Sequence, residues 1–268
     1  MRIAVMGDNC IDVYPRLGKR YVTGNAVDTG VHLRRLGAAV SIITTVGSDP
    51  DGEWTIKTLA HEGLDISHVK MANGATAVTQ MDMDGNERIH GDYLEGVGET
   101  MTFDQADVDF AAGHELVHAG LWGRVEPVIP NLRQAGAVVS FDYADRLDHP
   151  IIEMTLPYVS IGFFSYHRER DSFIENYLRD KVARGLKIAV ATMGEQGSLA
   201  WDGREFASVD AYPATVVNTV GAGDAYIAGF LFSYLSGGPL AENLDLGSRI
   251  GAESVSVFEP WEIKTDTG

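Results

Sequence analysis

The 268-residue chain is poor in cysteine, in positive charge and in long apolar runs. Its single cysteine, Cys10, excludes an intrachain disulfide and is typical of a reducing compartment, so we expect a cytoplasmic protein. Cys10 stands in an apolar stretch, which indicates an inert core thiol. The apolar stretch Ile3–Met6 is too short for a signal peptide, and no run approaches the roughly 18 apolar residues of a membrane span.

Positive charge is scarce, because 21 lysines and arginines face 38 acidic residues and leave a net charge of -17. Nucleic acids and anionic membranes both require a basic surface, so neither is expected as a partner. A phosphorylated small molecule is still compatible with this charge, because a local nest of backbone N–H groups holds an anion regardless of distant charges.

Short apolar strands alternate with amphipathic helical segments along most of the chain. Strands are predicted at residues 3–6, 40–46, 115–119, 138–141, 160–164 and 188–192. Helices are predicted at residues 27–36, 53–62, 125–135, 172–183, 224–235 and 240–258. This alternation predicts an α/β fold with a mostly parallel sheet sandwiched by helices, in which ligands bind at the carboxyl ends of the strands.

Two segments break the alternation. Residues 75–83 and 87–93 alternate apolar and polar side chains around Asp84-Gly85-Asn86, which predicts a β-hairpin, and residues 14–23 also resemble strand. We interpret these segments as a small β-lid over the site; an edge hairpin on the main sheet is the alternative. The predicted division is an α/β core of residues 1–13, 24–73 and 95–268, with a lid of residues 14–23 and 74–94.

The stretch Asn218–Asp224 reads Asn-Thr-Val-Gly-Ala-Gly-Asp and directly precedes the apolar run Ala225–Leu231. Its small residues predict a tight turn that opens a helix, where free N–H groups and the helix dipole favour an anion such as a phosphoryl group. A carboxylate at that position suits a general base that accepts the proton of an attacking hydroxyl. The alternative is a simple turn at Gly221 and Gly223, with Asp224 as a helix cap.

Two further polar groupings accompany this motif. Carboxylates and amides, which read sugar hydroxyls, follow the first strand and open the first helix: Asp8, Asn9, Asp12, Asn25 and Asp28. Each of them alone is better explained by a cap or a loop, but the cluster predicts a sugar site. Farther along, Gly194 and Gly197 let the backbone pass close to a ligand, although the same pattern is typical of an ordinary β-turn.

These motifs resemble those of the ribokinase-like carbohydrate kinases. The late signature of that family, Asp-Thr-x-Gly-Ala-Gly-Asp, is similar to residues 218–224, and its early Gly-Gly-Asn signature is similar to Thr23-Gly24-Asn25. Residues 192–198 resemble its nucleotide loop. Within the family, three short strings are most similar to the bacterial fructoselysine 6-kinases, which phosphorylate sugars condensed with an amino acid: residues 7–15, 91–97 and 117–123.

The resemblance implies an ATP- and Mg²⁺-dependent kinase acting on a primary hydroxyl of a sugar, in particular the 6-hydroxyl of a fructosamine. It assigns the general base to Asp224 and the anion hole to the preceding residues Gly221, Ala222 and Gly223. It assigns substrate binding to Asp12, Gly24, Asn25 and Asp28. Arg88 and Tyr93 are further substrate-binding candidates, because the predicted lid strands overhang the substrate; a solvated lid charge for Arg88 and ordinary packing for Tyr93 are the alternatives. It assigns the nucleotide border to Thr192, Gly194, Gly197 and Asn218. The lid would exclude water and pair between the subunits of a homodimer.

Four positions depart from the family pattern. Asn218 replaces an aspartate that ligates potassium in many members, so potassium activation is in doubt. Thr23 replaces a glycine and Asp28 an asparagine; an ionised Asp28 accepts hydrogen bonds but donates none. Ser165 stands where the family carries an asparagine near the metal–phosphate site, so the magnesium ligands are unknown.

Other functions fit the same motifs. A fructokinase, a ribokinase or a nucleoside kinase would share the fold and the base. The departures also fit a catalytically weak protein that senses a sugar or a nucleotide, although such a sensor has no use for the intact Gly-Ala-Gly-Asp sequence at residues 221–224.

Overall fold

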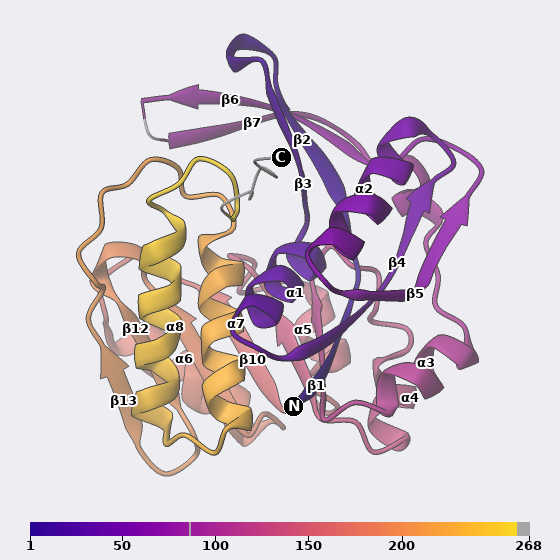
Figure 1. The fold of residues 1–268 in the computed structure, drawn as a ribbon. Coiled ribbons are helices and arrows are strands. Elements are labelled where there is room, and N and C mark those ends of the chain that lie inside the picture. The colour runs from indigo at the N-terminus through magenta and orange to yellow at the C-terminus, as the bar shows by residue number, and fades with distance from the viewer. Residues whose placement is uncertain (86, 262–268) are drawn as a thin grey trace.

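The computed structural model describes residues 1–85 and 87–261, which form two sheets and the helices around them (Figure 1). The main sheet has nine strands in the order β13-β12-β11-β10-β9-β8-β1-β4-β5. Its strands are β1 (Arg2–Met6), β4 (Ala39–Gly47), β5 (Asp65–Ala72), β8 (Leu116–Gly120), β9 (Val139–Asp142), β10 (Ile161–Ser165), β11 (Ile188–Thr192), β12 (Ser198–Trp201) and β13 (Phe206–Val209). Neighbours from β5 to β11 pair in parallel, whereas β12 and β13 pair antiparallel.

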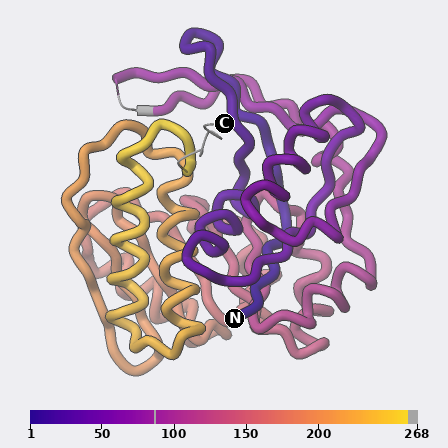
Figure 2. The backbone as a smooth tube through the Cα atoms, in the orientation of Figure 1, coloured from indigo at the N-terminus to yellow at the C-terminus, as the bar shows by residue number. Residues whose placement is uncertain are grey.

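Helices cover both faces of the main sheet, as the alternation of strands and helices predicts. One face carries α1 (Asn25–Arg35), α2 (Pro50–His61), α7 (Ala222–Leu235) and α8 (Leu240–Ser254). The other carries α3 (Gln105–Ala112), α4 (Ile129–Gln134), α5 (Pro150–Thr155) and α6 (Ser172–Ala183). Figure 2 shows α7 and α8 running side by side along one flank of the molecule.

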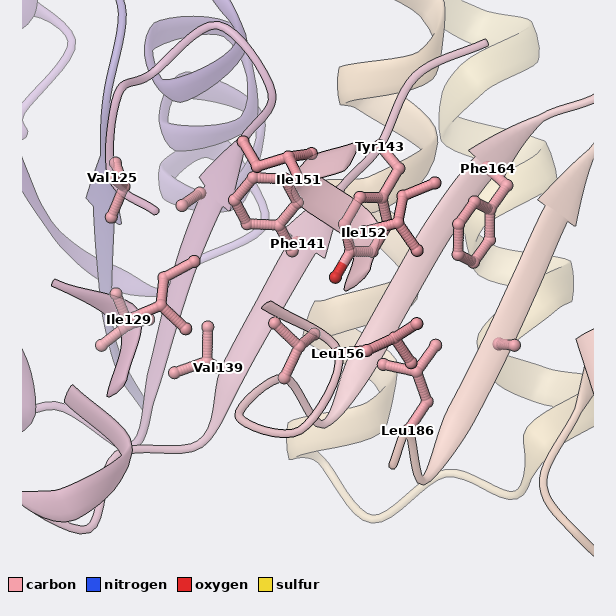
Figure 3. Close-up of a cluster of buried hydrophobic side chains, with 14 of the residues drawn as sticks. Val125, Ile129, Val139, Phe141, Tyr143, Ile151, Ile152, Leu156, Phe164 and Leu186 are labelled. Carbon is pink, nitrogen blue, oxygen red and sulfur yellow. The ribbon is translucent and has the colours of Figure 1, made fainter. Parts of the chain in front are cut away.

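Side chains of each central strand alternate between two buried apolar clusters. On β1, Ile3 and Val5 join the cluster under α1 and α7, whereas Ala4 and Met6 join the cluster under α3 to α6. Figure 3 shows part of the second cluster, where Phe141, Tyr143 and other side chains of strands and helices interdigitate. Burial on both faces explains why these strands read as continuous apolar runs.

A second, small sheet has the order β3-β2-β6-β7 and lies beyond the carboxyl ends of the main strands (Figure 1). It consists of β2 (Cys10–Tyr14), β3 (Lys19–Thr23), β6 (Val78–Asp84) and β7 (Glu87–Leu94), with the short 3-10 turn η1 (Pro15–Leu17) between its first two strands. The small sheet therefore begins at Cys10 and includes residues 10–13, which the sequence pattern places in the core. Two further 3-10 turns are η2 (Gly96–Thr100) and η3 (Gly194–Gln196).

The predicted fold class is confirmed, and the six predicted strands of the main sheet are present. Two predicted helices are shorter than expected: α4 begins only at Ile129, and α8 ends at Ser254. Directly after α8, the Val255 carbonyl accepts hydrogen bonds from the N–H groups of Val217 and Asn218 instead of from a further helical turn. The sequence pattern does not predict four elements, which are β5, β13, α3 and α5. In the described part of the chain, no helix has the length and apolarity to cross a membrane.

Candidate active site

The candidate site lies where the strand order reverses. From β1 the chain adds β4 and β5 on one side, while β8 and the later strands extend the sheet on the other. In open α/β sheets, ligands bind at the carboxyl ends of the strands beside such a reversal. Asp8 follows β1, Gly120 ends β8 and Asp142 ends β9, so this edge collects polar groups from distant parts of the sequence.

Asn25, the first residue of α1, holds three carboxylates together. Its Nδ2 donates to Asp224 Oδ1 at 2.6 Å and to Asp142 Oδ2 at 3.0 Å, and its backbone N–H donates to Asp8 Oδ2 at 3.0 Å. Gly120 makes room for this arrangement, because a Cβ there would lie 2.2 Å from Asn25 Oδ1. The structure thus brings the predicted residues Asn25 and Asp224 into direct contact.

The electrostatics of this cluster favour protonation of its carboxylates. Burial and the nearby charges of Asp142 and Asp8 raise the pKa of Asp224 well above its usual value, against the lowering effect of Asn25 and Arg88. Burial raises the pKa of Asp142 to about 6 and also raises the pKa of Asp8. A raised pKa makes Asp224 a stronger proton acceptor than an ordinary surface carboxylate, which suits a general base.

The first turn of α7 offers an open anion site beside Asp224. Gly221 caps the helix in the left-handed conformation (φ 70°), which favours glycine. Among the described residues, nothing accepts a hydrogen bond from the N–H of Gly223 or Asp224. No heavy atom lies within 4 Å of the position that a Cβ on Gly223 would take. Free N–H groups at an open helix start suit a phosphoryl group.

Two of the departures from the family pattern form one hydrogen-bonded pair. Thr23 Oγ1 donates to Asp28 Oδ2 at 2.7 Å, so the threonine hydroxyl supplies a donor to the carboxylate that replaces asparagine. Asp28 Oδ1 is buried and has no partner among the described residues. Burial and the charge of Asp224 raise the pKa of Asp28. Gly24, which stands between Thr23 and Asn25 in the sequence, is the N-cap of α1.

Asp12 enters the site from the small sheet, where it is 5% exposed on β2. Burial raises the pKa of Asp12 to about 6, and the charge of Arg88 acts against that rise. Tyr93 lies on β7 opposite Thr79, which in turn lies opposite Asp12. The three predicted substrate residues of the small sheet, Asp12, Arg88 and Tyr93, therefore share one region.

The structure does not bring Asn218 into the open site. Asn218 is fully buried, its Nδ2 donates to the Phe258 carbonyl at 2.8 Å, and its Oδ1 accepts from the Val220 N–H at 3.1 Å. Its amide thus anchors the segment after α8 against the loop before α7. The same segment brings Pro260 against Gly221, where an added Cβ would lie 2.9 Å from the Pro260 Cβ.

The predicted nucleotide loop lies at the end of β11. Thr192 ends this strand, and Gly194 is exposed, with no heavy atom within 4 Å of the place that a Cβ would occupy. Gly197 instead packs tightly, because a Cβ there would lie 2.1 Å from the Val209 carbonyl oxygen. β11 lies two strands away from β9, whose last residue is Asp142, so the loop borders a separate part of the same sheet edge.

Sequence reasoning missed Asp142. The signal was present, because this aspartate directly follows the predicted strand 138–141 at the sheet edge where ligands bind. In the described part of the chain, no three histidine, cysteine or acidic side chains are placed to hold a metal ion. A magnesium ion that accompanies a nucleotide takes ligands from the phosphates and from water, with one or two carboxylates at most.

Comparison with known proteins agrees with this geometry. The model of the pfkB family of carbohydrate kinases matches residues 13–262. Fructoselysine 6-kinase of Escherichia coli is 38% identical over 259 residues, which cover 97% of this chain and 99% of the relative. Fructosamine kinase FrlD of Bacillus subtilis is 28% identical, over 96% of this chain and 92% of the relative.

A solved structure of Arabidopsis thaliana ribokinase complexed with ribose and ATP superposes with a TM-score of 0.83 at 17% identity, over 96% of this chain and 92% of that chain. This likeness confirms the predicted fold. The family match over nearly the whole described chain, together with the geometry of Asp224 at the start of α7, leads to one conclusion: the chain belongs to the pfkB family of carbohydrate kinases.

Proposed function

We propose that this protein is an ATP-dependent kinase that phosphorylates the 6-hydroxyl of a fructosamine, a fructose condensed with an amino acid. The observation that carries the proposal is the position of Asp224, held by Asn25 beside the free N–H groups of α7. The two relatives named fructoselysine 6-kinase and fructosamine kinase support the substrate class.

In the proposed reaction, Asp224 accepts the proton of the sugar hydroxyl. The hydroxyl oxygen bonds to the γ-phosphorus of ATP, and the bond from that phosphorus to the leaving ADP breaks. The N–H groups of Gly223 and Asp224, with that of Ala222 beside them, stabilise the charge on the transferred phosphoryl oxygens. Thr192, Gly194 and Gly197 would border the nucleotide, and magnesium would be supplied as its complex with ATP. Asn218 acts only indirectly, by anchoring the loop before α7.

The acidic lining of the site supports a fructosamine over plain fructose. Three buried oxygens of this polar cluster have no hydrogen-bond partner among the described residues: Asp8 Oδ1, Asn25 Oδ1 and Asp28 Oδ1. Such acceptors bind sugar hydroxyls, and a cation beside Asp8 and Asp28 favours their ionised form and so opposes the rise of their pKa values by burial. The secondary ammonium of a fructosamine supplies that cation, and Asp28, where the family has a neutral asparagine, is the residue we assign to it. Fructose has no such group.

We also propose that the small sheet acts as the lid and that it pairs with a second copy of the chain. Its outer strands in the described sheet are β3 and β7, and Ile89 and Leu94 on β7 are 47% and 65% exposed. Light scattering across a concentration series tests this pairing: a monomer at every concentration would contradict it.

Replacement of Asp224 tests the proposed base. Asp224→Asn keeps the side-chain shape but cannot accept the proton, so we expect kcat to fall by roughly 10³-fold while the affinity for ATP is kept. Asp145→Asn, a change in an exposed carboxylate three residues beyond Asp142, is the matched control and should keep full turnover. Retained turnover in the Asp224→Asn variant would remove this residue from its proposed role.

A further inference from the structure

Strand β7 carries one extra residue opposite β6. Thr79 pairs with Tyr93 and Met81 pairs with His90, so Gly91 and Asp92 together face Gln80 alone. This is a β-bulge, which reverses the side-chain alternation of one strand relative to its partner and re-aims the side chains beyond it. Gly91 suits the bulge, because a Cβ there would lie 3.0 Å from the Gln80 carbonyl oxygen.

The bulge turns Arg88 toward the same side as the substrate residues. Directly opposed residues of an antiparallel pair share one face, so Tyr93, His90 and Arg88 lie on the face of Thr79, Met81 and Met83. Without the extra residue, Ile89 and Gly91 would occupy those inner positions instead of Arg88 and His90. Ile89 is 47% exposed on the other face.

The face of the small sheet that carries Thr79, Met81 and Met83 is the face directed toward the site. Asp12 lies opposite both Thr79 and Tyr21, and Cys10 Sγ lies 3.1 Å from Thr79 Oγ1. Tyr14 and Tyr21 are 1% exposed on it and pack with Met81. The bulge therefore places the guanidinium of Arg88 on the face that also carries Asp12.

Arg88 differs from the other cations of the small sheet. Arg16 pairs with Asp82, Lys19 with Glu259, and Arg20 with Asp51. In the part of the chain that the structure describes, Arg88 forms no ion pair, although its charge lowers the pKa of both Asp12 and Asp224. An arginine directed at the site but bound to no carboxylate is available to an anionic group of a ligand.

We infer that Arg88, turned inward by the bulge at Gly91, binds the carboxylate of the amino-acid part of the substrate. The inference rests on the proposed function, because a fructosamine carries both a secondary ammonium and a carboxylate. Asp28 binds the ammonium, and the planar guanidinium of Arg88 binds the carboxylate through two parallel N–H···O hydrogen bonds. Free fructose offers neither charge, so the two contacts together select a zwitterionic substrate.

Matched substrates with and without the carboxylate test the inference. One pair is fructoseglycine and 1-deoxy-1-methylamino-fructose; the other is ε-fructoselysine and its decarboxylated counterpart, fructosylcadaverine. In the wild-type enzyme, loss of the carboxylate should raise KM by roughly 10- to 100-fold in at least one pair and leave kcat nearly unchanged, because a charged hydrogen bond contributes about that much.

The variant Arg88→Gln should lose this preference, so that both members of the pair show the same, high KM. Arg88→Lys should restore part of the preference. Arg16→Gln, which removes another arginine of the small sheet, is the control and should keep the wild-type preference. Thermal melting of each variant separates loss of binding from loss of folding.

Three results would overturn the inference. Equal KM values within both substrate pairs in the wild type would show that the carboxylate is not recognised. An equal fall in kcat on all substrates in Arg88→Gln would place Arg88 at the transferred phosphoryl group instead. Turnover of free fructose without turnover of any fructosamine would contradict the proposed substrate itself, whereas failure of the inference alone leaves fructosamine turnover intact.

Discussion

The main sheet and the small sheet build two halves of one site by different means. In the main-sheet half, Asp8 and Asp142 follow or end buried strands, and both accept hydrogen bonds from Asn25 at the start of α1. The small sheet has little core of its own: Tyr14, Tyr21 and Met81 form its main buried cluster. The first half suits catalysis, which needs fixed geometry, and the second suits a part that admits substrate and then covers it.

One segment connects the two halves. Phe258, after α8, packs its ring against Tyr14 and Tyr21 with centroid distances of 5.1 and 6.5 Å, and Lys19 Nζ lies 4.0 Å from its ring centroid. The backbone carbonyl of the same residue accepts from Asn218, just before the anion site. The position of the small sheet is thereby linked to the loop that opens α7.

Apart from replacement of Asp224 itself, the largest effect should come from a change in the main-sheet half of the site. Gly120→Ala puts a Cβ 2.2 Å from Asn25 Oδ1 and forces Asn25 away from Asp224 and Asp142. Because a displacement of about 1 Å of catalytic groups costs on the order of 10²-fold in rate, kcat/KM should fall by about that factor. The coupled release of ADP measures it.

Gly98→Ala is the matched control for this variant, since nothing lies within 4 Å of a Cβ at Gly98. It should leave kcat/KM unchanged. Full activity in Gly120→Ala would show that the Asn25 network does not position the base.

The next effect concerns stability and pH in the small sheet. The pKa of Asp12 is raised to about 6 by burial, so the folded protein gains from its protonated form, and this stabilisation is lost as pH rises from about 4 through 6. The wild type should thus lose about 2 to 3 kcal/mol of unfolding free energy from this residue across that range. Asp12→Asn should show a flatter profile, measured by urea unfolding at pH 4 and pH 8.

Asp84→Asn, at an exposed carboxylate of β6, serves as the control and should keep the wild-type profile. If Asp12→Asn and the wild type lose the same free energy between the two pH values, then Asp12 is not buried in the way the structure describes.

A smaller effect should follow from weakening the connection between the halves. Phe258→Ala removes two aromatic contacts worth about 1 kcal/mol each, so the small sheet should close less well and KM for the sugar should rise about 3- to 10-fold with a smaller change in kcat. Leu17→Ala, at a 49% exposed side chain of the same sheet, should change neither. A kcat loss without a KM change would contradict the connection.

The smallest effect is expected from potassium. The amide of Asn218 is used within the protein and carries no charge, so adding potassium should change turnover by less than about twofold relative to sodium at equal ionic strength. Strong stimulation by potassium would show that the loop before α7 binds the cation despite the asparagine.

The sequence predicts the main-sheet half of the site better than it predicts the small sheet. Buried parallel strands and the Gly-Ala-Gly-Asp turn are local patterns, so the fold and the helix start at Asp224 follow from them, whereas the contact of Asn25 with Asp224, 199 residues apart, does not. Pairing partners across a sheet are not local, so the start of β2 at Cys10 and the bulge opposite Gln80 were missed. Asn218 anchors its loop through a hydrogen bond to Phe258, 40 residues later, and no local sequence pattern predicts that contact.

The most direct test of the proposed activity is coupled ADP release with ATP and magnesium on fructoselysine, fructoseasparagine, fructose, ribose and adenosine. We expect strong turnover on the fructosamines and at most weak turnover on fructose, ribose and adenosine. Turnover confined to a free sugar or a nucleoside would contradict the proposed substrate while leaving Asp224 as the base. Binding without turnover of any of the five would contradict the kinase itself and favour a sensor.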